Sequence, residues 1–315
     1  MKKVNLVLSM VALLVMACST TFVVTSTPAS QTDMLGTIVA ATMQALTSAP
    51  PVFTPTTALE QMTPTVIIQV TETPTAPANS NQILVSNLGK SFTIPQGVAT
   101  GATVESLPAQ LDPNMPIWDI YPAHDEFTLD GYALQFKFFA PKILFYPATE
   151  FSNVNPGAAQ IINDMKALLA NPSAPLPQTI PFLPLFNAAQ VFHSNEQFLT
   201  FQNGTGIRFL TQFAQAPLPV NNHELFYTFQ GITSDGMYYI AAILPVNAAF
   251  LVEDSEPDST PPPDGIPFDW NNFESLPTYL DAVKQKLNAT DPNSFTPPLS
   301  SLDLMMQSLS VTGNP

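Results

Sequence analysis

The 315-residue chain contains one cysteine, Cys18, one arginine, Arg208, and three histidines. A single cysteine excludes an internal disulfide, because two thiols are needed to form one. Nine basic residues stand against 24 acidic ones, which gives a formal net charge of −15. A surface this acidic repels phosphate backbones, and no basic stripe offsets it, so nucleic acid is not expected as a partner.

Motifs for the common catalytic chemistries are also missing from the sequence. No Gly-x-Ser-x-Gly elbow presents a nucleophilic serine, and no glycine-rich loop is spaced to hold a phosphate. The histidines His124, His193 and His223 form no His-Glu-x-x-His run, which would place two zinc ligands on one helical face. A packed, hydrogen-bonded role is therefore favoured over a zinc role, and His193 is expected near a strand end.

Long apolar runs are absent as well. The best candidate, residues 4–17, is 14 residues long, short of the roughly 20 that a transmembrane helix needs. It follows Lys2 and Lys3 and ends in a small residue, Ala17. A charged start, a short apolar middle and a small residue at the cut site are typical of a secretory signal peptide. We therefore expect residues 1–17 to be removed on export.

The sequence Val15-Met16-Ala17-Cys18 resembles the lipobox of bacterial lipoproteins, in which the cysteine becomes the first residue and carries lipid. The resemblance implies lipidation of Cys18 and attachment to the cell membrane or outer envelope, facing the extracytoplasmic side. Residues 18–315 carry a formal charge of −17, so the lipid, and not electrostatic adhesion to head groups, would provide the membrane contact. An unacylated Cys18 would instead be a free reactive thiol, which is unusual outside the cell.

Residues 18–82 combine the expected lipidated cysteine with a Thr/Pro-rich linker. Between Ser19 and Gln82 there are 16 Thr and 7 Pro in 64 residues, with three acidic residues and no basic one. Repeated Thr-Pro steps keep the backbone extended and deny it regular hydrogen bonding, so we expect a disordered stalk. Residues 34–46 are an exception, because their apolar spacing approximates a short helix.

From residue 83 to residue 315 the composition becomes that of a folded domain. Twenty of the 22 Phe, all seven Tyr and both Trp lie in this region. Its 233 residues suffice for one large domain, and no second Thr/Pro linker interrupts them, so we expect a single domain. Residues 253–267 are its most loop-like segment.

Two β-hairpins are predicted in the middle of this region. The turn Asn203-Gly204-Thr205-Gly206 and the turn Thr233-Ser234-Asp235-Gly236 are each expected to use glycine with positive φ. The strands that they join are 198–201 with 207–210, and 224–230 with 237–244. Together the hairpins predict a four-stranded antiparallel meander, and residues 134–146 are expected to add a strand or two, bent at Pro141.

Three amphipathic helices are predicted around these strands. The first follows Asn155-Pro156, an N-cap and a first-turn proline, and ends before Asn171-Pro172. The second has its apolar stripe within residues 276–287, and the third within 302–309, started by Ser300 or Ser301. The expected fold class is therefore α+β, with an antiparallel β-sheet meander packed by helices.

The segment from Tyr227 to Tyr239 has the form Tyr-x-Phe-x-Gly-x-Thr-x-Asp-Gly-x-Tyr-Tyr, and a helix ending Gln307-Ser308-Leu309 follows. This meander and helix resemble the PsbP/Mog1-like sandwich of several bacterial lipoproteins, over roughly residues 182–309. The stalk and domain together resemble uncharacterised lipoproteins of Chloroflexota-type bacteria. The resemblance carries no catalytic motif and implies a binding or assembly role.

Arg208 and a group of carboxylates are the charged features that invite a specific role. Arg208 lies in a β run, where we expect it to bind a carboxylate bidentately within the fold, with ligand binding as the alternative. Clustered carboxylates are what Ca²⁺ prefers, although their spacing here is not that of an EF-hand and a solvated, proline-stiffened loop is the competing interpretation. These candidate Ca²⁺ ligands are Glu253, Asp254, Glu256, Asp258 and Asp264. No other cofactor is expected.

Two segments couple large aromatic rings with carboxylates, as sugar- or peptide-binding clefts do. The candidate ligand-binding residues are Trp118, Asp119 and Tyr121 in one segment, and Asp269 and Trp270 in the other. The alternative is that these rings belong to the core, since most aromatic side chains do.

The sequence therefore predicts a membrane-anchored extracytoplasmic lipoprotein whose domain is a non-catalytic binding or assembly module. Its expected partners are the membrane, through the lipid anchor, and an envelope or external protein or a glycan. The alternative is a carboxylate-dependent envelope hydrolase acting on glycans, which needs two carboxylates roughly 5 to 10 Å apart in one cleft. Its candidate pair would come from Asp119, Asp125, Glu126 and Asp269.

Overall fold

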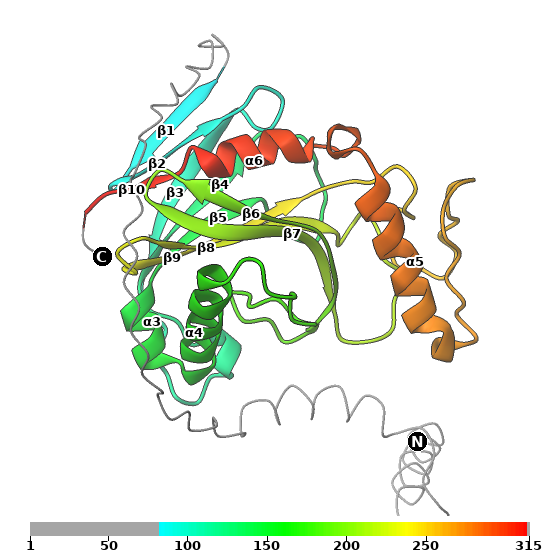
Figure 1. Ribbon diagram of the computed structural model, residues 1–315, viewed down its shortest axis with the longest axis horizontal. Coiled ribbons are helices and arrows are strands. Elements are labelled where there is room, and N and C mark those ends of the chain that lie inside the picture. The colour runs from blue at the N-terminus through cyan, green and yellow to red at the C-terminus, as the bar shows by residue number, and fades with distance from the viewer. Residues whose placement is uncertain (1–81, 314–315) are drawn as a thin grey trace, which may run out of the picture. The chain divides into compact units, whose positions relative to one another are not determined.

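The structure is a computed structural model that describes residues 82–313 (Figure 1). Two antiparallel β-sheets and several helices make up this part of the chain, which confirms the α+β prediction. The predicted signal peptide, the lipidation of Cys18, the stalk and its short helix lie outside the described residues. Within residues 82–313, none of the helices has the length and apolar character that crossing a membrane requires.

The larger sheet has seven strands in the order β3-β4-β5-β9-β8-β7-β6, all paired antiparallel. The strands are β3 (Gly101–Leu107), β4 (His124–Asp130), β5 (Lys142–Pro147), β6 (Ala189–Phe201), β7 (Gly204–Ala214), β8 (Phe226–Thr233) and β9 (Tyr238–Pro245). Strands β6 to β9 form the predicted meander. The strand expected over residues 134–146 is correct only from Lys142 onward, because residues 131–141 form a loop.

The glycines of the first hairpin do not act as predicted. Gly204 and Gly206 lie within β7, and neither has a positive φ. A Cβ at Gly204 would lie 2.1 Å from the Phe201 ring, and one at Gly206 would lie 2.4 Å from the Phe229 ring. These glycines are needed because aromatic rings cross the strand there. In the second hairpin, Gly236 does have a φ of 73°, as expected.

The smaller sheet joins the two ends of the described chain. Its strands are β1 (Ile83–Asn87), β2 (Lys90–Ile94) and β10 (Ser310–Val311), in the order β1-β2-β10. β10 pairs with β2 across more than 200 residues of sequence. Sequence periodicity did not predict these three strands.

The helices cover both faces of the large sheet (Figure 1). They are α3 (Ala148–Val154), α4 (Pro156–Ala170), α5 (Leu276–Ala289) and α6 (Leu299–Gln307), with single 3₁₀ turns η2 (Ile117–Asp119), η3 (Phe273–Ser275) and η4 (Pro292–Ser294). The three predicted helices are confirmed as α4, α5 and α6. The predicted serine cap of α6 is wrong, because the helix begins at Leu299 and no side chain caps it.

Strand alternation divides the core into two apolar layers. Phe127, Phe145 and Ile240 pack in the layer that also contains the stripes of α5 and α6. Leu144, Phe209 and Tyr239 point to the opposite layer, which contains the stripe of α4. The sheet is therefore buried on both faces, and ligand contacts have to use its ends, its loops or its outer helices.

Candidate interaction site

The loop of residues 108–123, which joins β3 to β4, carries an unusual number of exposed apolar side chains. Four prolines stiffen it, at positions 108, 113, 116 and 122. Its large exposed side chains are Leu111, Met115, Ile117 and Trp118, with exposed fractions between 37% and 52%. We call residues 108–123 the Trp118 loop. A cluster of this kind on one ordered loop is typical of an interaction surface rather than of the core.

Asn155 holds the centre of the Trp118 loop. This fully buried side chain donates from Nδ2 to the carbonyl oxygens of Ile117 and Ile120, at 2.8 and 2.9 Å. Its Oδ1 accepts from the backbone N–H of Ala158 at 3.1 Å, which is the N-cap bond of α4. One amide thus caps a helix and fixes the η2 turn on which Trp118 lies.

The end of the Trp118 loop is fixed by its own backbone and by aromatic packing. Gln110 and Tyr121 exchange two backbone hydrogen bonds, at 2.9 and 3.0 Å. The Tyr121 ring packs edge-on against His124 with centroids 5.1 Å apart, and His124 in turn contacts Tyr146 at 4.4 Å. Tyr121 is therefore part of the support for the loop, whereas Trp118 is on its surface.

His124 is a structural residue at this support. Its Nδ1 donates to the Pro122 carbonyl oxygen at 2.9 Å. Burial lowers the pKa of His124, because desolvation penalises the imidazolium, and the Pro122 contact and the nearby Glu126 and Asp125 only partly oppose this. The ring is consequently neutral at pH 7, which fits a fixed hydrogen-bond donor.

The second predicted aromatic segment is separate from the first. Trp270 is half-buried and packs edge-on against Phe268, with centroids 4.9 Å apart. Asp269 accepts from the backbone N–H of Asn271 at 2.9 Å, which forms a local turn. Among the described residues, no hydrogen bond, ion pair or ring contact joins this segment to the Trp118 loop. Trp118 is thus exposed as the binding prediction requires, while Trp270 is half-buried against Phe268.

Strand geometry excludes one of the candidate hydrolase pairs, Asp125 with Glu126. Asp125 and Glu126 are neighbours on β4, so their side chains point to opposite faces of the sheet. Asp125 pairs with Lys90 at 2.6 Å, and Glu126 pairs with Lys142 at 2.6 Å. These two carboxylates cannot share a cleft, and each is already neutralised by a lysine.

Residues 253–267 form a loop, as predicted, but three of the five candidate carboxylates each have a separate partner. Glu253 pairs with Lys137 at 3.1 Å, and Asp264 pairs with Lys286 at 3.2 Å. Asp254 accepts from the Ser259 hydroxyl and from the backbone N–H of Glu256, which lowers its pKa. Across residues 82–313, no three acidic, histidine or cysteine side chains are grouped to hold a metal ion. The Ca²⁺ hypothesis therefore lacks a converging set of ligands.

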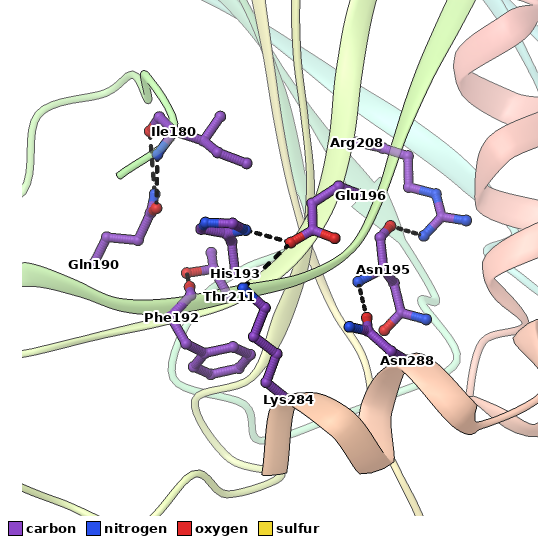
Figure 2. Close-up of polar contacts among 10 residues, drawn as sticks. All are labelled: Ile180, Gln190, Phe192, His193, Asn195, Glu196, Arg208, Thr211, Lys284 and Asn288. Atoms are coloured by element: carbon purple, nitrogen blue, oxygen red, sulfur yellow. Dashed lines mark hydrogen bonds and ion pairs between the residues drawn. The ribbon is translucent and has the colours of Figure 1, made fainter. Parts of the chain in front are cut away.

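A buried polar cluster surrounds a bulge in β6 (Figure 2). His193 Nδ1 contacts Glu196 Oε1, and Lys284 Nζ lies 3.9 Å from the same oxygen. Burial raises the pKa of Glu196, but the contacts with His193 and Lys284 outweigh it and leave this pKa below its usual value. Because Lys284 belongs to α5, the cluster joins that helix to the sheet. His193 is packed and hydrogen-bonded, as the sequence suggested, but it lies inside β6 and not at a strand end.

Arg208 binds a carboxylate within the fold, as predicted. Its Nε lies 3.2 Å from Asp303 Oδ1, and Nη2 donates to Gln197 Oε1 at 2.9 Å. The expected bidentate geometry is wrong, because Nη1 and Nη2 donate to the Asn195 carbonyl oxygen and to Gln197 and leave only Nε at the carboxylate. The Tyr227 hydroxyl donates to the same Asp303 oxygen at 3.0 Å. Burial raises the pKa of Asp303, and the Arg208 and Tyr227 contacts counter it. This group fixes α6 on the sheet.

Sequence patterns missed the most informative parts of the Trp118 loop. They singled out Trp118 but not Leu111, Met115 or Ile117, and they assigned Asn155 only the role of a helix cap. The available signal was the series of prolines and apolar residues between two short strands.

A search against protein-family models, curated proteins and solved structures gives no match for the chain.

Proposed function

We propose that this protein is a membrane-anchored extracytoplasmic lipoprotein whose α+β domain is a non-catalytic binding or assembly module. Export is supported by residues 2–17, where two lysines precede a short apolar run that ends in the small residue Ala17. Lipidation is supported by Cys18, which follows in a lipobox-like position. Antiparallel strands packed by helices are consistent with a PsbP/Mog1-like sandwich, which we include in the proposal. The site of action would be the cell membrane or outer envelope.

The Trp118 loop carries the binding proposal. Tryptophan and methionine are enriched at the centres of protein interfaces, and here both are exposed on one loop. Because Asn155 and the Gln110–Tyr121 pairing already hold the loop, little conformational entropy is lost when a partner binds. The partner that fits is an envelope or external protein with an apolar surface of its own.

The anchor is tested by fractionating cells that express the wild-type chain or Cys18→Ser. The wild type should be recovered with membranes and should incorporate labelled palmitate. Cys18→Ser should lose the label. Wild-type protein that takes up no palmitate and remains in the cytosolic fraction would refute the anchor.

The binding role is tested by purifying the anchored protein from chemically crosslinked membranes. The double variant Ile117→Ser/Trp118→Ser should lose a co-purifying protein that the wild type retains. Leu304→Ser is the matched control, because Leu304 is 56% exposed on α6, far along the chain from the Trp118 loop. Equal recovery of the co-purifying protein with all three chains would show that the Trp118 loop does not bind it.

A further inference from the structure

Residues 131–141, which join β4 to β5, present aromatic rings to solvent and hide a lysine. Phe136 is 96% exposed and Phe138 is 62% exposed, whereas the side chain of Lys137 between them is only 6% exposed. This inverts the usual pattern, in which lysine faces water and phenylalanine is buried. We call residues 131–141 the Phe136 loop.

The backbone holds Phe136 in this exposed position. Its φ is 57°, in the left-handed region that non-glycine residues rarely adopt. On one side of it, Gln135 Nε2 donates to the Tyr132 carbonyl oxygen at 2.8 Å. On the other side, Lys137 Nζ contacts Glu253 at 3.1 Å and the Phe138 N–H donates to the His223 carbonyl oxygen at 2.9 Å. The ring therefore projects from a segment that is fixed on both sides.

A hollow of about 270 Å³ lies beside the projecting ring. Its lining residues include the apolar Leu129, Leu134 and Phe139. The charged lining residues are Asp130, whose carboxylate accepts from the Thr103 hydroxyl, and Lys137, which is paired with Glu253. Small-molecule sites usually occupy about 300–1,000 Å³, so a hollow of this size suits one long side chain of a larger partner.

The charges around the Phe136 loop are mainly negative. Asp130 is exposed at the hollow. His223, which accepts from the Phe138 N–H, donates its own N–H to the Glu253 carbonyl oxygen, so the acidic residues Glu253, Asp254 and Glu256 begin at this point. The one lysine of the loop, Lys137, is already paired with Glu253. Anionic lipid or phosphate would be repelled here, whereas a cationic group would be attracted.

We propose that the Phe136 loop binds an apolar segment of a partner protein that contains lysine or arginine. A cationic side chain of that segment enters the hollow beside Asp130, and its apolar neighbours pack on Phe136 and Phe138. The Trp118 loop precedes β4 and the Phe136 loop follows it. Since β4 has seven residues, its two ends are about 20 Å apart. The domain then has two separate contact surfaces, so the second does not depend on the function proposed for the first.

The test uses the purified full-length chain and two labelled synthetic peptides, one of leucine and lysine and one of leucine and glutamate. Fluorescence anisotropy should show binding of the lysine peptide and none of the glutamate peptide. Phe136→Ser/Phe138→Ser should weaken binding at least about tenfold, because exposed aromatic anchors dominate such contacts. Asp130→Asn should weaken it about two- to fivefold, the range for a partly exposed ion pair.

Matched controls separate this site from general attraction to an acidic protein. Leu304→Ser removes an exposed apolar side chain from α6, and Asp281→Asn removes an exposed carboxylate from α5. Both should bind the lysine peptide like the wild type. Thermal melts of Phe136→Ser/Phe138→Ser should stay close to the wild type, since the rings are 96% and 62% exposed and only Phe138 has ring contacts, with Phe139 and His223.

Three results would overturn the proposal. The first is equal affinity of the wild type and the Phe136→Ser/Phe138→Ser variant for the lysine peptide. The second is self-association of the wild type in sedimentation experiments that this variant abolishes, which would make a second copy the occupant. The third is binding to phosphatidylcholine vesicles that this variant abolishes, which would make a lipid surface the occupant.

Discussion

The side-chain amide of Asn155 donates to the carbonyl oxygen of Ile117 at 2.8 Å, across 38 residues of sequence. Because the same side chain caps α4, the first turn of that helix and the Trp118 loop form one hydrogen-bonded unit. The exposed apolar residues are thereby attached to the helix layer that packs on the sheet. The proposed binding surface is consequently preorganised rather than formed on contact.

Replacing Asn155 separates its two roles. Asn155→Asp keeps an acceptor for the Ala158 N–H but loses both donors to the Trp118 loop, whereas Asn155→Ala loses the cap as well. We expect Asn155→Ala to lower the free energy of unfolding by about 1–3 kcal/mol, from a lost cap and two unpaired carbonyls. Fluorescence anisotropy of Trp118, in a Trp270→Phe background, should fall in both variants. Unchanged anisotropy in Asn155→Asp would show that the amide donors do not hold the loop.

A methyl group at Gly206 should be strongly destabilising. Its Cβ would lie 2.4 Å from the Phe229 ring and 2.6 Å from the Gln230 carbonyl oxygen, so backbone must move. We expect Gly206→Ala to cost about 1–3 kcal/mol in urea unfolding, as overpacking does. Gly101→Ala is the control, since its Cβ would meet only Asp130 Oδ2 at 3.9 Å. Similar losses of unfolding free energy in the two variants would contradict the explanation that the Phe229 ring requires a glycine at position 206.

The lowered pKa of His124 predicts a pH dependence of stability. The unfolded chain binds a proton near the ordinary value of 6.5, while the folded chain does so only at lower pH. The folded state therefore loses stability as the pH falls below about 6.5 and recovers it as the pH rises. In His124→Gln this component should vanish, giving a shallower slope of unfolding free energy between pH 5 and 6.5. A slope identical to that of the wild type would show that His124 is not desolvated.

The contact between Arg208 and Asp303 should appear as coupling in a double-mutant cycle. Arg208→Met leaves the Asp303 carboxylate, whose side chain is only 14% exposed, without its cation and should cost about 3 kcal/mol. Asp303→Asn added to Arg208→Met should recover part of the loss, because the neutral amide still accepts from the Tyr227 hydroxyl. Chemical denaturation of the single and double variants measures the coupling free energy between the two side chains. Strict additivity would mean that Arg208 and Asp303 act independently.

Local patterns predicted the elements whose determinants lie close together in sequence. The Asn155-Pro156 pair marked the start of α4, and Gly236 marked the turn between β8 and β9. Strands β1 and β2 form a local hairpin whose turn residues Leu88 and Gly89 both have positive φ, and this signal was overlooked. Strand β10 was missed because it has two residues and pairs with β2 from the far end of the chain. No local signal reports such a pairing.

The surfaces were harder to predict than the elements. Aromatic content around residues 134–146 suggested a strand, yet Phe136 is exposed in a loop, and its neighbour Lys137 pairs with Glu253, 116 residues later. Similarly, Trp118 and Trp270 occur in comparable sequence contexts, and only their packing partners distinguish the exposed Trp118 ring from the half-buried Trp270 ring. Exposure depends on tertiary contacts that sequence spacing does not contain.

The account is tested most directly by photo-crosslinking in intact cells. A benzophenone amino acid placed at position 118 of the anchored chain should give a discrete crosslinked protein, because the Trp118 loop is proposed to contact a partner. The same group at Gln285, an exposed position on α5, should not give that product. An identical pattern from both positions, or no product from position 118, would contradict the proposed binding function.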